Sequence, residues 1–205
     1  NPGLAPDIIN NSWACPWSEG CEQGTLRRVV EAVRAAGIMV VVSAGNSGTA
    51  CGSVAEPPAH YEASFTVGNY DHRSGNIAYS SSRGPVSVDG SQRLKPDIVA
   101  PGQAIRSCIR GTAYSLLSGT SMAAHVAGVA ALLWSADPSL RGDIERTEQI
   151  LKEAAVPRYD TSCGGDADGH PNNVWGWGQL DAYRAIELAI GPLSAFYLPL
   201  VVAAP

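Results

Sequence analysis

The chain has 205 residues, 45% of them hydrophobic, which is enough to bury the core of one large domain or a large part of one. Only 16% of residues are charged and the formal net charge is −5, so a nucleic-acid partner is not expected. No apolar run is long enough to span a membrane, and no signal peptide opens the sequence, which begins as if within a domain.

The first forty residues predict a strand, a helix and a second strand. A strand is expected over 7–13, and residues 25–37 carry apolar side chains at helical spacing, with Gly37 as the stop. Residues 38–42 are apolar throughout, which is typical of a parallel strand covered on both faces. We therefore predict an α/β fold with a doubly wound, mostly parallel sheet flanked by helices and incomplete at the N-terminus.

Short strands and helices continue along the chain. The predicted strands cover 64–69, 96–102 and 104–109, and the predicted helices cover 121–136, 143–155 and 180–190. Residues 1–190 are assigned to the main domain and 191–205 to an apolar tail. The tail is too short to cross a bilayer, and either an extra strand or a surface-attachment segment would explain it.

The five cysteines fit neither the CxxC spacing nor a His/Cys cluster, so zinc is a poor candidate. Cys15 and Cys21 bracket the stretch CPWSEGC, whose proline and glycine could bend it into a disulfide hairpin; buried free thiols are the alternative. Disulfides would indicate an oxidising compartment, and we expect the protein at the cell surface or outside the cell. The odd number leaves one cysteine without an intramolecular partner.

Ligands of an open α/β sheet gather beyond the carboxyl ends of its strands, here at 12–17 and at SAGNSG, 43–48. SAGNSG has neither GxGxxG nor GK[ST], so nucleotide binding is weakly supported. Asn46 offers an amide that could donate a hydrogen bond to an oxyanion. A turn asparagine with a structural role is the alternative.

Ser121 opens a predicted helix among small residues, in the stretch GTSMAAHVAG. A helix start has unpaired N–H groups and a partial positive charge, and it therefore favours a group that becomes negative there. A serine that attacks a carbonyl generates such a charge. An N-cap serine before a tightly packed helix is the alternative.

Four motifs in this order, SAGNSG, SSRGP, KPDIVAPG and GTSMAAHVAGVAALL, resemble the subtilisin-like serine proteases, or subtilases. The resemblance extends from about residue 8 to about residue 189. It implies that Ser121 is the nucleophile that forms an acyl-enzyme, and that the Asn46 amide and the Ser121 N–H form the oxyanion hole. The motif KPD at 95–97 looks structural.

The resemblance also implies how a polypeptide substrate is bound. Two walls of the substrate groove are expected, formed by Ser12, Trp13 and Ala14 and by Ser43, Ala44 and Gly45. Glu56 is placed near the floor of the first specificity pocket, where a buried carboxylate would favour Lys or Arg at the cleavage position. A solvent-facing Glu56, or one that supports a cation site, is the equal alternative.

The remaining expectations concern the backbone and metals. A cis peptide bond is expected at Pro57–Pro58, as in the relatives. The chemistry requires no cofactor or catalytic metal. Any metal is expected to be a structural calcium ion, for which Asp166 and Asp168 are the candidate ligands.

Subtilases order their triad as Asp, His, Ser, and this sequence contains neither the aspartate nor the histidine motif. We expect the chain to be the C-terminal part of a secreted endopeptidase that needs the N-terminal part of the same protease as a partner and is inactive alone. The alternatives are an inactive peptide-binding protein and a structural remnant. His125 is the one replacement base considered, because it lies within i,i+4 reach of Ser121.

The serine block also departs from the family pattern GTSMAxPHVAG. Here MAAHVAG is one residue shorter and lacks the proline. A missing residue turns the helix that follows by about 100° relative to Ser121. Either Ser121 or the packing of Val126, Val129 and Leu132 is therefore expected to shift, unless the first turn absorbs the change.

Overall fold

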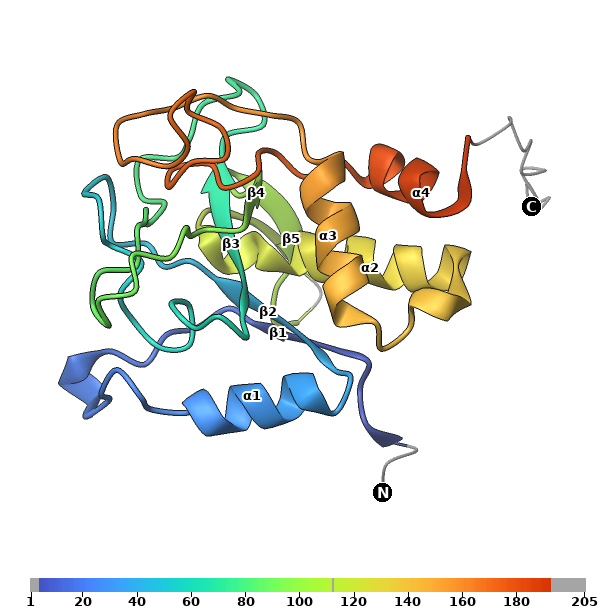
Figure 1. The fold of residues 1–205 in the computed structure, drawn as a ribbon, viewed down its shortest axis with the longest axis horizontal. Coiled ribbons are helices and arrows are strands. Elements are labelled where there is room, and N and C mark those ends of the chain that lie inside the picture. Colours follow the sequence, from blue (N-terminus) through green and yellow to red (C-terminus); the bar gives the residue numbers. More distant parts are fainter. Residues whose placement is uncertain (1–3, 112, 193–205) are drawn as a thin grey trace.

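A parallel sheet of four strands lies at the centre of the fold (Figure 1). The structure is a computed structural model that describes residues 4–111 and 113–192. The strands follow one another in the sheet in chain order: β1 (Ile8–Asn11), β2 (Met39–Ser43), β3 (Phe65–Tyr70) and β4 (Ile98–Pro101). All three pairings are parallel, which confirms the predicted sheet.

Helices cover both faces of this sheet. They are α1 (Arg27–Ala35), α2 (Ala124–Ala136), α3 (Ile144–Ala154) and α4 (Ala182–Ile190). The side chains of β2 explain this arrangement. Met39 and Val41 pack on one face, in a cluster with residues of α2, α3 and α4. Val40 and Val42 pack on the other face, in a cluster with Val30 of α1. Because successive side chains of a strand point to opposite faces, an entirely apolar strand needs a helix on each side. The doubly wound α/β prediction is confirmed.

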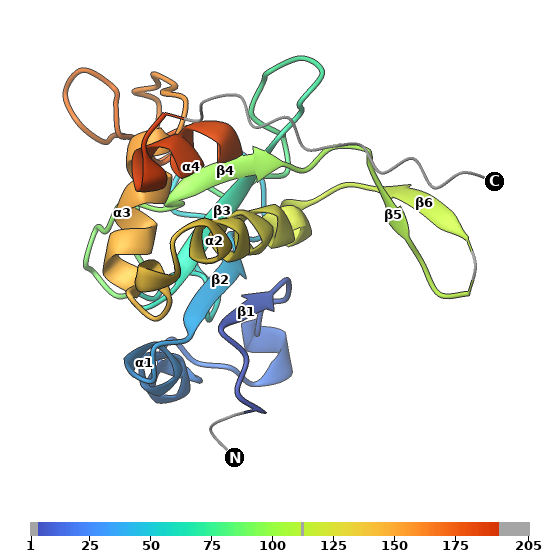
Figure 2. The same ribbon diagram turned by 90° about the vertical axis from the view of Figure 1, so that its right-hand side faces the viewer.

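The strand β1 forms one side of the sheet (Figure 2). It pairs with β2, and its other edge has no strand partner within residues 4–111 and 113–192. A largely apolar cavity of about 280 Å³ lies between β1 and α1. Its lining residues are Ile9, Asn11, Trp13, Leu26, Val29, Val30, Val33, Val40 and Pro58. An unpaired strand edge beside apolar side chains is a surface suited to a partner.

A two-stranded hairpin projects from the sheet domain (Figure 2). It consists of β5 (Ile105–Cys108) and β6 (Tyr114–Leu117), which pair antiparallel. The strand predicted over 104–109 is therefore present, but it lies outside the main sheet, and β6 was not predicted. Tyr114 and Leu116 on one face and Leu117 on the other are all more than half exposed, so neither face of β6 shows the burial that would give a clear alternating pattern.

The helix α2 does not begin at Ser121. Residues Thr120–Ala123 form a 3₁₀ turn, and α2 starts after it. A 3₁₀ turn rotates about 120° per residue instead of about 100°, so four residues gain about 80°, close to the turn expected from one missing residue. Val126 and Val129 are buried as a result, but Leu132 is 52% exposed and Leu133 occupies the core position. Of the three residues whose packing was expected to shift, Leu132 is the one that lies outside the core.

Two disulfides connect loops near the carboxyl ends of the strands. One joins Cys15 to Cys21, as expected from the CPWSEGC stretch, and the other joins Cys51 to Cys163. Cys108 in β5 is an exposed free thiol. The peptide bond Pro57–Pro58 is cis, as expected.

The tail proposed for 191–205 lies almost entirely outside the described residues. Its two alternatives therefore stay predictions. Among the helices that the structure describes, none is long and apolar enough to cross a membrane.

Candidate active site

Ser121 lies in the 3₁₀ turn before α2, at the rim of a hollow of about 590 Å³. Its side chain is partly exposed. The hollow is lined by Ile105, Arg106, Ser107, Ser121, Met122, Ala124, His125, Gly128, Val129 and Leu132. These residues come from β5 and from one side of the turn and α2, so the hairpin and the helix together shape the space beside the serine.

Asn46 follows the carboxyl end of β2 and is held by the residue that precedes Ser121. Its Oδ1 accepts a hydrogen bond from the Thr120 N–H at 3.0 Å and another from the Thr120 hydroxyl at 3.1 Å. The backbone N–H can only donate, so the amide oxygen must face Thr120, and the Asn46 NH₂ remains available as a donor. Such a donor near Ser121 is the chemistry that an oxyanion hole requires.

Thr120 was not predicted as a site residue. Its hydroxyl also accepts a hydrogen bond from the Gly45 N–H at 3.2 Å, so it connects the β2 loop to the serine turn by two bonds. The only signal in the sequence was a hydroxyl residue immediately before Ser121. This signal does not indicate the hydrogen-bond partner of Thr120, because Thr120 and Asn46 are 74 positions apart in the sequence.

Glycines allow these segments to approach one another. A Cβ on Gly119 would lie 3.3 Å from Asn46 Nδ2, and Gly119 has a φ of 149°, which side chains rarely adopt. A Cβ on Gly102, which ends KPDIVAPG, would lie 2.7 Å from the Gly119 carbonyl oxygen. The small residues around Ser121 therefore keep the Asn46 amide and the serine turn close together.

The two predicted walls lie on neighbouring strands. Ser12, Trp13 and Ala14 follow β1, and Ser43, Ala44 and Gly45 end β2 and continue beyond it. The parallel register pairs Asn11 with Val42, so both segments leave the sheet at the same edge. Ser43 and Ala44 are buried, whereas Trp13 is 47% exposed. The Ser12 hydroxyl donates a hydrogen bond to the Ser121 carbonyl oxygen at 2.7 Å.

Glu56 lies in a loop beside the first of these walls. The Cys15 N–H donates a hydrogen bond to the Pro57 carbonyl oxygen at 2.9 Å, which joins the two segments directly next to Glu56. The Glu56 side chain is partly buried. In the part of the chain that the structure describes, its carboxylate forms no ion pair.

The four histidines have different environments. His60 is completely buried with Nε2 at 3.0 Å from the Gln23 carbonyl oxygen, and burial lowers its pKa although this hydrogen bond opposes the shift. His170 contacts the Trp177 carbonyl oxygen at 3.0 Å, and His72 is exposed. His125 lines the hollow beside Ser121, but its Nδ1 is bonded to the Met122 carbonyl oxygen at 2.9 Å.

The KPD segment has a structural role. The buried Lys95 ammonium donates to Asp97 Oδ2 and to the Ser64 carbonyl oxygen, both at 2.6 Å. Burial would raise the pKa of Asp97, but the charges of Lys95 and Lys152 and the bond from the Thr66 N–H outweigh it, and the pKa is lowered. These charges connect β3 and β4 to α3 and lie outside the lining of the Ser121 hollow.

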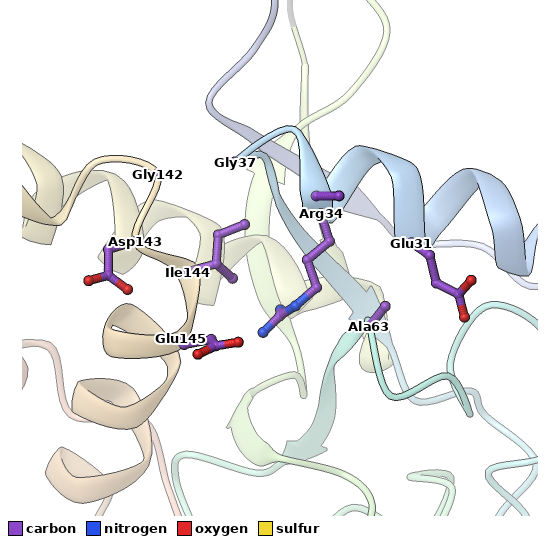
Figure 3. Close-up of a pocket in the computed structure, with 9 residues that line it drawn as sticks. Glu31, Arg34, Gly37, Ala63, Gly142, Asp143, Ile144 and Glu145 are labelled. Carbon is purple, nitrogen blue, oxygen red and sulfur yellow. The ribbon is translucent and has the colours of Figure 1, made fainter.

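A further cavity, of about 400 Å³, lies between the end of α1 and the start of α3 (Figure 3). Figure 3 shows Arg34 reaching from α1 toward Glu145, and Arg34 also forms an ion pair with Glu148 of α3. None of the predicted site residues lines this cavity. The charged side chains of Arg34 and Glu148 connect the two helices, and the cavity shares no lining residue with the Ser121 hollow.

The calcium expectation gains no support from the structure. Asp168 Oδ1 accepts a hydrogen bond from the His170 N–H at 3.2 Å, as in an ordinary turn. Within the described ranges, no group of three or more His, Cys, Asp or Glu side chains could hold a metal ion, and the loop of Asp166 is no exception.

Comparisons with known proteins identify the family of this chain. The family model described as the subtilase family, Peptidase S8, matches residues 4–178. Bacillopeptidase F of Bacillus subtilis is 38% identical over 193 residues, which cover 91% of this chain and 12% of that protein. The serine protease AprX of Bacillus subtilis is 34% identical over 186 residues, which cover 80% of this chain and 39% of that protein.

Solved structures give the same result for the fold. The Patellamide maturation protease PatA has a TM-score of 0.68 and 29% identity, with 92% of this chain and 65% of that chain covered. The Prenylagaramide maturation protease PagA has a TM-score of 0.70 and 25% identity, with 91% of this chain and 63% of that chain covered. The chain thus spans less than two thirds of these relatives.

Proposed function

Because this chain belongs to the subtilase family of serine proteases, we propose that it is the serine-bearing part of an endopeptidase that hydrolyses peptide bonds through an acyl-enzyme on Ser121. The observation that carries the proposal is the pair of hydrogen bonds between Asn46 and Thr120, which ties an amide donor to the turn that holds the serine. An amide with its oxygen already satisfied offers its NH₂ to an oxyanion without rearrangement.

In the proposed reaction, the Ser121 Oγ attacks the carbonyl carbon of the scissile bond and gives its proton to a histidine base. The carbonyl oxygen becomes negative and accepts hydrogen bonds from the Asn46 NH₂ and the Ser121 N–H. The C–N bond then breaks, and the leaving amine takes the proton from the histidine. Water, activated by the same base, hydrolyses the ester and restores the serine.

The base and its aspartate are supplied by the N-terminal part of the same protease in this proposal. Three features support such a partner: the edge of β1 that no strand of the described residues pairs with, the apolar cavity beside α1, and the hollow between β5 and α2. More than a third of each solved relative lies outside the region that this chain matches. The N-terminal part would extend the sheet at β1 and bring its histidine to the hollow beside Ser121.

Two further properties belong to the proposal. Glu56 selects Lys or Arg at the cleavage position, and the support is that its loop is hydrogen-bonded through Pro57 to Cys15, next to the wall formed by residues 12–14. The protein acts outside the cell or at its surface, in keeping with the two disulfides. Polypeptides are the substrate, and the chemistry requires no cofactor.

A fluorophosphonate probe tests the proposal, because it reacts with a serine only when the serine is activated. The 205-residue chain is treated alone and after mixing with the N-terminal part of the protease, and the adduct is located by mass spectrometry. Labelling of Ser121 in the mixture alone is expected. Labelling of the lone chain would assign the base to this chain, with His125 the first residue to replace, and no labelling in either sample would overturn the endopeptidase proposal.

The absence of labelling would favour a second candidate, a peptide-binding protein without catalysis. In the described structure no histidine forms a hydrogen bond with the Ser121 side chain, which is the observation in favour of this candidate. Binding of an unlabelled peptide in the groove, measured by calorimetry, would then distinguish it from a structural remnant.

A further inference from the structure

The Ser12 side chain is hydrogen-bonded to the serine turn. Its hydroxyl donates a hydrogen bond to the Ser121 carbonyl oxygen at 2.7 Å, between residues that are 109 positions apart. The Asn10 Nδ2 in turn donates to Ser12 Oγ at 2.8 Å. The Ser12 hydroxyl can take part in both bonds, since a hydroxyl can accept one hydrogen bond and donate another.

These two consecutive hydrogen bonds end at the backbone carbonyl of Ser121, the proposed nucleophile. The residue whose carbonyl it holds also carries the attacking Oγ and one N–H of the proposed oxyanion hole. A backbone carbonyl has two lone pairs, so it can accept the Ser12 bond and still accept a second hydrogen bond. Asn10 of β1 and Ser12 after it therefore restrain the serine turn through a contact separate from that of Asn46 and Thr120.

We propose that Asn10 and Ser12 form a relay that positions Ser121, and that Ser12 is a positioning residue as well as part of the substrate wall. The inference rests on the proposed endopeptidase function. A substrate strand pairs with backbone groups, so the Ser12 backbone can contact substrate while its hydroxyl holds the turn. Movement of about 1 Å at a reacting atom can cost about a hundredfold in rate, which gives a single restraint a measurable effect.

The test compares four forms of the complete protease: wild type, Ser12→Ala, Ser12→Thr and Asn10→Ala. For a peptide substrate, Ser12→Ala is expected to lower kcat by about tenfold with KM changed less than about twofold, because the ground-state contacts of the wall stay in place. Ser12→Thr keeps the hydroxyl and is expected to restore most of kcat. Asn10→Ala is expected to give a smaller loss.

A small fluorophosphonate separates positioning from substrate contact, because it reaches Ser121 without occupying the wall. The relay predicts that Ser12→Ala slows labelling about as much as it lowers kcat, whereas a wall contact predicts slower peptide cleavage with unchanged labelling. That second result would overturn the relay. The double variant Asn10→Ala/Ser12→Ala should match Ser12→Ala, and additive losses would show that Asn10 does not act through Ser12.

The failure of the relay can be distinguished from the failure of the proposed function. If the wild-type complete protease neither cleaves peptides nor reacts with the probe, the endopeptidase proposal fails. If it does both and Ser12→Ala behaves as wild type, only the relay fails. Thermal unfolding of each variant shows whether a loss of rate follows a loss of folding.

Discussion

The Thr120 hydroxyl and the Asn46 carboxamide are joined at 3.1 Å, and the Thr120 N–H reaches the same oxygen at 3.0 Å. One residue thus fixes the orientation of the amide, because both of its donors point at Oδ1. Rotation of the amide by half a turn would place its NH₂ against the backbone N–H of Thr120, which cannot accept a hydrogen bond.

Replacement of Thr120 with valine removes the hydroxyl and keeps the shape of the side chain. We expect kcat of the complete protease to fall by about tenfold with little change in KM, because the Asn46 amide loses one of its two restraints. Steady-state kinetics on a peptide substrate measures this. Thr120→Ser is the matched control and should retain most of the activity; equal losses in both variants would assign the effect to packing.

Asn46→Leu tests the proposed oxyanion donor directly. Turnover of the complete protease should fall by about 10²–10³, which is the magnitude known for the oxyanion-hole asparagine of this family. The loss should appear in kcat, since the charge that the amide stabilises develops only in the transition state. Unchanged turnover would contradict the role of Asn46.

Glu56 predicts a preference for a basic residue at the cleavage position. Peptides with arginine there should be cleaved faster than matched phenylalanine peptides, and Glu56→Gln should reduce that preference by about 30-fold, since loss of one partner of a buried charge pair costs about 2 kcal/mol or more. The ratio of the two kcat/KM values is the measurement. Equal or better use of phenylalanine by the wild type would exclude the role.

The buried Lys95–Asp97 pair predicts a pH dependence of stability. The pKa of Asp97 is lowered in the folded state, so the pair adds stability above the unfolded pKa of about 3.9 and loses it as the pH falls through the lower folded value. Urea unfolding from pH 7 to pH 2.5 should show this loss. Asp97→Asn should cost about 3–5 kcal/mol at pH 7, because it leaves the Lys95 charge buried without a partner.

A matched pair of variants isolates the ionic contribution. Replacing both partners, as Lys95→Met/Asp97→Leu, should cost less than Asp97→Asn alone, because the buried Lys95 charge is removed together with its partner. Part of the cost stays, since Lys152 loses its ion pair with Asp97 and the Thr66 N–H loses its acceptor. The acid loss of stability should also become shallower. A double variant as unstable as the single one would show that packing, and not the charge, determines the cost.

The disulfide Cys51–Cys163 should contribute more to stability than Cys15–Cys21. It spans 112 positions instead of 6, and a longer closed loop removes more entropy from the unfolded chain. Cys51→Ala/Cys163→Ala should lower the free energy of unfolding by about 2–4 kcal/mol, and Cys15→Ala/Cys21→Ala by less. Denaturant unfolding is the measurement, with Cys108→Ser as a control that should change little.

Much of the fold could be predicted because its signals are local. The apolar run of β2 indicates a strand covered on both faces, and the spacing of apolar side chains indicates α1. Ser121 and Asn46 stood out as chemical groups at a helix start and a strand end. Their family motifs then gave them roles.

The supporting contacts could not be predicted in the same way. Thr120 meets Asn46, and Ser12 meets Ser121, through hydrogen bonds that form only after β1, β2 and the serine turn come together. The strand β6 was missed because its side chains are largely exposed, so no alternating pattern marks it. The 3₁₀ turn corresponds to the alternative in which the first turn absorbs the missing residue, but the sequence alone could not decide between that and a shift of Ser121 or of the helix packing.

The 3₁₀ turn at Thr120–Ala123 also preserves the rise along the helix axis before α2. It rises about 2.0 Å per residue against about 1.5 Å for an α-helix, so its four residues cover about 8 Å, nearly the 7.5 Å that five α-helical residues would cover. The distance along the axis between Gly119, which contacts the Asn46 loop, and the buried Val126 is therefore almost that of a chain one residue longer. The turn lets the nucleophile and the core-facing helix keep their separate positions in a shortened sequence.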